Sequence, residues 1–160
     1  MDVIKTRLQA DGRLPREQRR YSGQADAFER MVLMFQKEVA DRLTAQPGSK
    51  SYGRLSVITQ WVCQVKPLFN VSKQAFTPPP KVASTVVELI PRAEPLAPAT
   101  FSDLEKVTQA AFGQRRKMLR SSLKSLGLDP TKEGISPDVR AEDLGVAEFC
   151  ALARQLSKQA

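Results

Sequence analysis

A proline cluster followed by a β-branched run constrains this sequence more than any other feature. Phe76 is followed at a spacing of two by the run Pro78–Pro80, and Lys81 comes directly after it. Proline fixes its own φ angle and biases the residue before it away from helix, so this segment is expected to be a stiff loop. The run Val82–Ile90 is rich in β-branched residues and ends at Pro91, which predicts a buried strand. A rigid aromatic beside a core strand suits a flat ligand, but proline clusters more often mark plain surface turns. These residues alone leave both interpretations open.

The residues before this loop predict a strand, two helices and a second strand. The apolar run Glu29–Phe35 indicates a buried strand, and Gln36–Ala45 has the apolar spacing of a helix. A second helix is expected over residues 51–60. Trp61–Val71 alternates like a strand, and Pro67 places its far end at an edge or a bend. Because a longer loop joins this strand to the next one, we expect the two to pair antiparallel.

The second half of the chain predicts a small helical domain. Three prolines, at positions 91, 95 and 98, indicate a linker over residues 93–100. A helix is expected from an N-cap at Ser102 or Asp103, a second over Gln114–Leu126 and a last one over Val146–Leu156. We therefore expect a leader over residues 1–28, an α/β part over 29–92 and a helical domain over 101–160.

Composition narrows the classes of partner and chemistry. The formal net charge is +8, which suggests a polyanion such as nucleic acid, although a merely soluble basic surface is an equal alternative. The chain has no histidine, which removes the commonest general base and metal ligand. Cys63 and Cys150 lie far apart among apolar residues, so a reducing, cytoplasmic setting fits. No apolar run is long enough to span a membrane, and the N-terminus lacks the apolar core of a secretory signal.

A basic segment within the predicted helical domain is the strongest candidate for binding a polyanion. Residues 106–128 contain no acidic residue. On a helix over Gln114–Leu126, three cations would form a stripe at four-residue spacing, namely Arg116, Arg120 and Lys124. Such a stripe suits RNA phosphates, and the alternative is a solvated basic face. Outside this segment, Arg54 and Lys81 are lesser candidates that are equally well explained as surface charges.

Several motifs together resemble one enzyme family. The pattern Phe-x-Pro-x-Pro-x-Val-x-Ser that begins at Phe76 resembles the late motif of the rRNA adenine N6,N6-dimethyltransferases. Residues 31–43, 49–57 and 112–120 agree with the same family in order and spacing. From about residue 29 onward, the chain resembles the bacterial small-subunit rRNA dimethyltransferases.

The resemblance implies a fold and roles for particular residues. It implies the C-terminal portion of a Rossmann-like class I methyltransferase sheet, followed by a small all-α domain that contacts rRNA. It also implies that Phe76 stacks on the target adenine and that S-adenosylmethionine is the methyl donor. The residues expected to contact RNA are Arg54, Lys81, Arg115, Arg116, Lys117, Arg120 and Lys124. The expected partner is small-subunit rRNA or a pre-ribosomal particle.

The motifs that would hold the methyl donor are missing from this sequence. Donor binding needs a glycine-rich turn between a strand and a helix, but no two glycines here have Gly-x-Gly spacing. The family's Asn-Leu-Pro-Tyr tetrapeptide is absent too, because Val71 and Ser72 follow the only asparagine, Asn70. We therefore expect the substrate-side half of the enzyme, without donor binding or methylation by this chain alone. The alternative is a non-catalytic RNA- or ribosome-binding module.

Two further expectations concern the ends of the predicted α/β part. A few strands cut from a larger sheet would expose an edge and an apolar face, which a partner or a dimer would cover. Residues 2–28 weakly resemble the matrix-side segment of mitochondrial carriers, but no membrane span follows them, and we assign no transport function. We expect residues 1–28 to be a poorly ordered leader.

Overall fold

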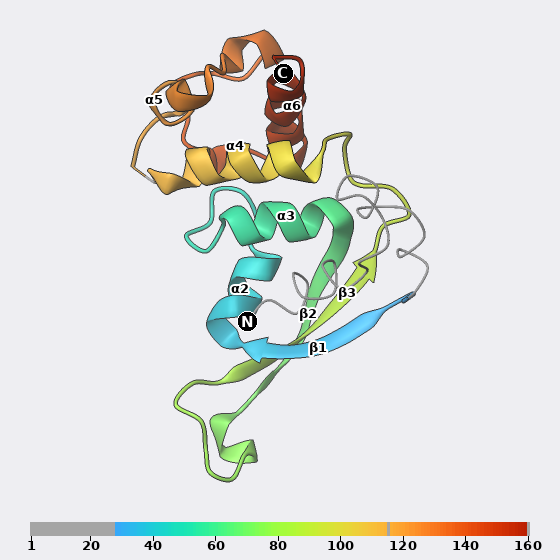
Figure 1. Cartoon of the computed structure of the whole chain (residues 1–160). Coiled ribbons are helices and arrows are strands. Elements are labelled where there is room, and N and C mark those ends of the chain that lie inside the picture. Colours follow the sequence, from blue (N-terminus) through green and yellow to red (C-terminus); the bar gives the residue numbers. More distant parts are fainter. Residues whose placement is uncertain (1–27, 115, 160) are drawn as a thin grey trace.

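In the part of the chain that the structure describes, the sheet has three strands, and two helices precede its second strand. The computed structural model describes residues 28–114 and 116–159. In chain order the elements of this part are β1 (Met31–Gln36), α2 (Lys37–Thr44), α3 (Arg54–Val62), β2 (Cys63–Val71) and β3 (Ser84–Pro91). The strand order is β1-β3-β2, with β3 in the centre (Figure 1).

Both outer strands run antiparallel to β3, so β1 and β2 point the same way. The expected antiparallel pairing of β2 with β3 is confirmed. The expected irregularity is confirmed as well, because β2 is an edge strand and its register shifts between Pro67 and Phe69. A proline lacks the N–H that a central strand needs, which explains its place at an edge.

β1 is only half buried, so the expectation of a buried strand is wrong for one of its faces. Met31, Leu33 and Phe35 pack against a small core that includes Ala40 of α2. The alternate residues Val32 and Met34 are 53% and 52% exposed. The sequence hides this difference because both faces of β1 carry apolar side chains.

Trp61 belongs to α3 and not to the following strand, which corrects our strand prediction for residues 61 and 62. Its side chain is fully buried, and its indole N–H donates to the carbonyl of Ala97 at 2.8 Å. The backbone N–H of Leu96 donates to the carbonyl of Trp61, also at 2.8 Å. The segment predicted as a linker is therefore fastened to α3.

The helical part shares its core with α3. Its elements are α4 (Phe101–Gly113), α5 (Leu119–Ser122), the 3-10 turns η4 (Lys124–Leu126), η5 (Pro130–Glu133) and η6 (Ala141–Asp143), and α6 (Val146–Ser157). Val57 and Trp61 of α3 lie in one hydrophobic cluster with Leu104 and Phe149, while Val62 packs against both this cluster and the core of the sheet. The division into two domains remains a prediction, but α3 contacts both. None of the described helices is long and apolar enough to cross a bilayer.

The predicted continuous helix over residues 114–126 is wrong. α4 ends at Gly113, and only the short α5 and η4 follow. The backbone N–H of Leu119 donates to the carbonyl of Val139 at 2.9 Å, and that of Arg120 to Pro137 at 3.0 Å. These bonds go to a distant loop instead of to the preceding helical turn, which breaks the helix.

The first helix of this part begins slightly earlier than the sequence indicated. Its N-cap is Thr100, whose hydroxyl oxygen accepts from the backbone N–H of Asp103 at 3.2 Å, so our assignment of Ser102 or Asp103 is corrected. Near its other end, the Phe112 ring packs against Tyr52 and Phe149, with ring centroids 6.1 and 5.4 Å away. The loop before α3 is thereby tied to the helical part.

Both cysteines are expected to resist alkylation in the folded protein. Cys63 is 6% exposed and Cys150 fully buried. Burial raises the pKa of the Cys63 thiol, and it raises that of Cys150 to about 11. At pH 8 only about one Cys150 thiol in a thousand is then ionised, and the thiolate is the reactive form. A maleimide should react at least about 100-fold more slowly than with the urea-unfolded chain. Equal rates in the two states would contradict this.

Candidate nucleic-acid interface

Phe76 lies at the far end of the β2–β3 hairpin, which projects beyond the helices (Figure 1). After β2 the chain forms a short 3-10 turn, η3 (Lys73–Ala75), whose N-cap Ser72 accepts from the backbone N–H of Gln74 at 3.3 Å. The Phe76 N–H closes this turn by donating to the carbonyl of Lys73 at 3.4 Å. The three prolines follow after Thr77, and the Thr77–Pro78 peptide is cis. Phe76 thus sits between a hydrogen-bonded turn and a proline run, partly exposed.

The hairpin tip lies at the end of the sheet where ligands usually bind. The register places Gln36 of β1 and Val71 of β2 on either side of Ser84. Both are carboxyl-terminal strand residues, so β1 and β2 end at the same edge of the sheet as the Phe76 loop. Open α/β sheets bind ligands at the carboxyl ends of their strands.

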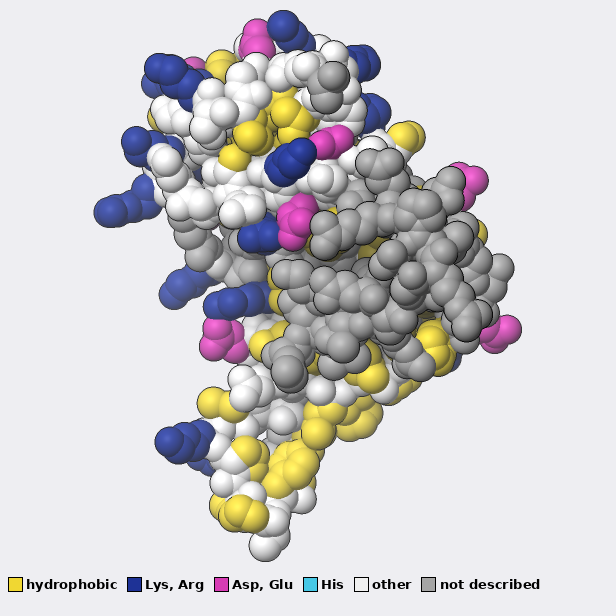
Figure 2. Space-filling model, viewed as in Figure 1, with side chains coloured by type: hydrophobic (Ala, Val, Ile, Leu, Met, Phe, Trp, Pro, Cys, Tyr) yellow, Lys and Arg dark blue, Asp and Glu magenta, His cyan; other side chains and the backbone are white. Residues whose placement is uncertain are grey.

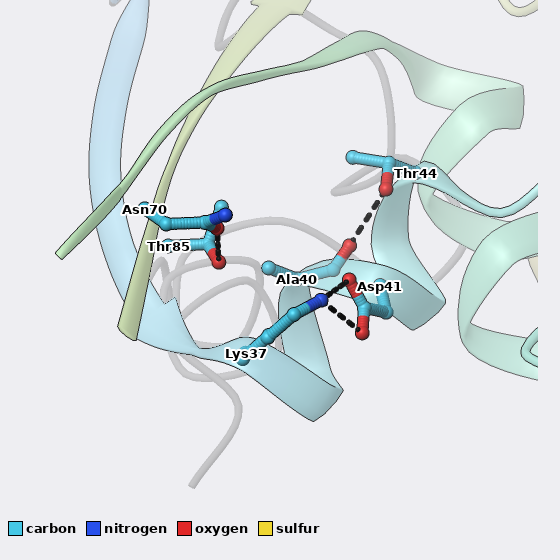
Figure 3. A network of polar contacts seen from close by, with 6 residues as sticks. All are labelled: Lys37, Ala40, Asp41, Thr44, Asn70 and Thr85. Atoms are coloured by element: carbon cyan, nitrogen blue, oxygen red, sulfur yellow. Dashed lines mark hydrogen bonds and ion pairs between the residues drawn. The ribbon is translucent and has the colours of Figure 1, made fainter. Parts of the chain in front are cut away.

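A recess at this edge was not anticipated from the sequence. It has a volume of about 380 Å³ and is lined by Gln36, Lys37, Glu38, Asp41, Ser51, Val82 and Ala83. Figure 3 shows Lys37 held over α2 by both carboxylate oxygens of Asp41, at 2.9 and 2.8 Å. The nearby hydroxyl of Thr85 donates to the side chain of Asn70 at 2.7 Å and links β3 to β2. The sequence offered one sign of this recess, namely the i,i+4 spacing of Lys37 and Asp41 directly after a predicted strand.

Of the isolated cations predicted to contact RNA, Lys81 and Arg54 differ in environment. Lys81 is exposed on the hairpin loop, as is Lys73, and neither has an ion-pair partner within the described ranges. The guanidinium group of Arg54 instead forms an ion pair with the carboxylate of Glu105, with N and O 3.2 Å apart, and this pair links α3 to α4. Its charge is already matched, so Lys81 is the better candidate of the two.

The basic segment does not form the expected helical stripe. Arg116, Lys117 and Lys124 are exposed and have no ion pair with any other described residue. Arg120 lies 2.7 Å from Asp138, an acidic residue that the sequence window of 106–128 leaves out. Arg115 lies outside the described residues. Arg116 and Lys117 therefore lie at the corner between α4 and α5, and Lys124 follows α5 in η4, instead of all three lying along one helix.

The cations of the two parts share one edge of the molecule. Figure 2 shows Lys and Arg side chains along its left edge, from the helical part above to the hairpin below. In Figure 1 the α4–α5 corner and the hairpin tip lie on this same side. The exposed cations of the helical part and of the hairpin therefore face the same side of the molecule.

The described residues do not fit a bound methyl donor. In the part of the chain that the structure describes, one strand runs directly into an α-helix, at Gln36 and Lys37 between β1 and α2. Neither residue is a glycine, and the side chains there line the recess instead of leaving the backbone open to a cofactor. The three described glycines with positive φ lie elsewhere, at Gly48, Gly127 and Gly134.

Comparison with known families assigns the chain. The family model described as ribosomal RNA adenine dimethylase matches residues 18–158. The chain belongs to this family. The match begins before residue 29, where the recognisable motifs begin, and it extends into the segment that resembled mitochondrial carriers, so that resemblance finds no support.

Individual relatives belong to the same family, and their lengths show what share of such a protein this chain covers. A ribosomal RNA small subunit methyltransferase A from Paramagnetospirillum magneticum is 72% identical over 137 residues, which are 82% of this chain and 48% of the relative. The protein of the same name from Rhodospirillum rubrum is 65% identical, over 81% of this chain and 46% of its own length. The chain thus spans about half the length of the curated relatives it matches.

Solved structures confirm the fold expected for the family. A dimethyladenosine transferase from Plasmodium falciparum superposes with a TM-score of 0.74 at 26% identity, over 85% of this chain and 61% of the other. The 23S rRNA methyltransferase ErmE, at 21% identity, shares the fold with a TM-score of 0.54. The expected α/β class, with part of a methyltransferase sheet, is confirmed.

Proposed function

We propose that this chain is the substrate-side half of an rRNA adenine dimethyltransferase. In this role it binds small-subunit rRNA or a pre-ribosomal particle in the cytoplasm and presents an adenine for N6 methylation. The observation that carries the proposal is the position of Phe76, at the carboxyl ends of β1 and β2 on a braced hairpin tip.

Phe76 would stack on the target base after it leaves its helix. Enzymes that modify a base extrude it and hold it by stacking, which needs an exposed aromatic face on a rigid support. The 3-10 turn and the prolines around Phe76 provide that support. Lys73 and Lys81, exposed on the same loop, would neutralise the phosphates beside the extruded nucleotide.

The α4–α5 corner would hold the rRNA backbone at a second place. Arg116, Lys117 and Lys124 are exposed cations without ion pairs to other described residues. Lys and Arg side chains of this kind contact phosphates and position the RNA without reading its bases. We keep Arg54, Arg115 and Arg120 as weaker candidates for the same role.

In this proposal the methyl donor, S-adenosylmethionine, is held by a part of the enzyme other than this chain. S-adenosylmethionine supplies the methyl group when it is bound, and this chain binds the substrate RNA. A second candidate, an RNA- or ribosome-binding module without catalysis, is favoured by the strand-to-helix turn at Gln36, which does not fit the donor. The two candidates share the same RNA contacts.

Substitution of Phe76 by alanine tests the RNA contact. We expect the Kd for small-subunit rRNA to rise by about 5- to 150-fold, because stacking on one base contributes about 1–3 kcal/mol. Fluorescence anisotropy with a labelled rRNA fragment would measure it. The matched control is Phe69→Ala, which removes another exposed phenylalanine of the same hairpin. Equal losses in both variants, or no loss in Phe76→Ala, would contradict the proposal.

A further inference from the structure

The recess at the carboxyl edge of the sheet combines an apolar wall with hydrogen-bonding side chains. Val82, which is 48% exposed, and Ala83 form the apolar wall at the end of the β2–β3 hairpin loop. The opposite wall is polar and contains Glu38 and Asp41 of α2 and Ser51 of the segment after α2. At about 380 Å³, the recess is large enough for a ligand of small-molecule size.

The two carboxylates of the recess are neutralised but can still accept hydrogen bonds. Asp41 accepts from the Lys37 ammonium group with both oxygens, at 2.9 and 2.8 Å (Figure 3), and Glu38 forms an ion pair with Arg42. Because one cation accompanies each carboxylate, the recess has no surplus charge that would attract an anion or a metal ion. An ionised carboxylate has about four lone-pair sites, so each retains acceptor capacity toward a neutral N–H donor.

A nucleobase with an exocyclic amine fits this combination of walls. Its flat face would pack on the apolar wall, and its amine would donate to Glu38 or Asp41, as cytosine N4 does to carboxylates. Gln36 and Ser51, which also line the recess, can both donate and accept, so they suit the ring nitrogens and carbonyl oxygens of a base. Uracil has no amine and would place a carbonyl oxygen against the carboxylates, so that two acceptors face each other.

The base would belong to the same RNA as the target adenine without being the target itself. Phe76 does not line the recess, so a base stacked on Phe76 lies outside it, although the same loop carries Phe76 and Val82. Among the described residues that line the recess, Lys37 is the one cation, and Asp41 already holds it. A free nucleotide would therefore find no unpaired cation for its phosphate there, whereas the exposed Lys81 adjoins Val82 on the loop and can hold the phosphate of an RNA chain.

We propose that this recess holds a nucleotide next to the target adenine and selects a base with an exocyclic amine at that position. Glu38 and Asp41 are then specificity-determining residues that contact the substrate RNA. The inference rests on the proposed function and deepens it, because Phe76 must hold the target base before a neighbouring base can reach the recess.

Two labelled single-stranded RNAs of identical composition, UUCACUU and CUUAUUC, test the inference. They differ only in whether cytidine or uridine flanks the single adenosine, whose stronger stacking on Phe76 sets the register. We expect the full chain to bind UUCACUU at least about 5-fold more tightly in anisotropy titrations, because an amine contact discriminates between bases by at least that factor. The double variant Glu38→Ala/Asp41→Ala should bind both RNAs equally. The ratio of the two Kd values is insensitive to the altered net charge, because both RNAs carry the same charge.

The matched control is Glu29→Ala/Glu94→Ala. It also removes two exposed carboxylates, but they lie before β1 and after β3, at the end of the sheet away from the recess. This control should retain the preference for UUCACUU. Circular dichroism melts would show that both double variants remain folded, as expected for alanine in an exposed helical position.

Several results would overturn the inference. They are equal binding of the two RNAs by the unaltered chain, an undiminished preference in Glu38→Ala/Asp41→Ala, and an equal loss of preference in the control. Displacement of UUCACUU by cytidine monophosphate at about 1 mM would also overturn it, because the recess would then take a free nucleotide without the rest of an RNA chain. The proposed function is read separately, from whether Phe76→Ala weakens the binding of both RNAs, whatever their ratio.

Discussion

Replacing Trp61 by alanine is expected to lower the free energy of unfolding by about 3–5 kcal/mol, the range for removing a large buried aromatic. Trp61 is fully buried in the cluster that joins α3 to the helical part. Its loss would leave a cavity between the two parts and remove the donor that the Ala97 carbonyl accepts at 2.8 Å. Urea denaturation monitored by circular dichroism would measure the change, because the helices supply most of that signal.

A conservative variant separates the cavity from the hydrogen bond. Trp61→Phe keeps much of the apolar volume and removes the indole N–H, so it should cost about half as much or less. Both variants should unfold in one transition if α3 and the helical part form a single cooperative unit. A loss below about 1 kcal/mol for Trp61→Ala would contradict the shared core.

The second large effect is expected on RNA affinity. The double variant Arg116→Glu/Lys117→Glu reverses two exposed cations at the α4–α5 corner, and we expect the affinity for small-subunit rRNA to fall about 100-fold at low salt. The slope of log K against log salt concentration should also become shallower by about 1 to 2, since two phosphate contacts are lost. Anisotropy titrations at several salt concentrations would give both quantities.

The control for this variant must change the charge equally. Lys132→Glu/Lys158→Glu also reverses two exposed lysines of the helical part, in η5 and after α6. It should reduce affinity only through the net charge and leave the slope nearly unchanged. We avoid Arg120→Glu, because that change would also break the ion pair with Asp138. Equal effects of the two double variants would mean that the corner is not the contact.

Local patterns in the sequence predicted the parts that local forces determine. The β-branched run and the prolines around Phe76 predicted a stiff loop and an antiparallel hairpin, because φ restriction and strand propensity act over a few residues. The position of Phe76 at the ends of β1 and β2 followed from that topology. The residues of α2 and α6 were found in the same way, from apolar spacing at 3.6 residues.

Long-range contacts decided what could not be predicted. The helix expected over residues 114–126 is interrupted because Leu119 and Arg120 bond to the loop at Pro137–Val139, about 20 residues away. The neutralisation of Arg120 by Asp138 has the same cause. The exposed face of β1 was hidden because Val32 and Met34 are as apolar as the buried Leu33, so composition could not tell the two faces apart.

The attachment of α3 on two sides has a consequence for the geometry of the substrate. Val62 packs into both hydrophobic clusters, and Trp61 fastens residues 96 and 97 to the same helix. Because α3 packs against both parts, the sheet that carries the hairpin and the helical part that carries the α4–α5 corner are held together through one helix. In the proposed function, an rRNA would bind both places only if its extruded base and the contacted phosphates are already the right distance apart. The spacing between the two contacts, and not nucleotide identity, would then select the substrate.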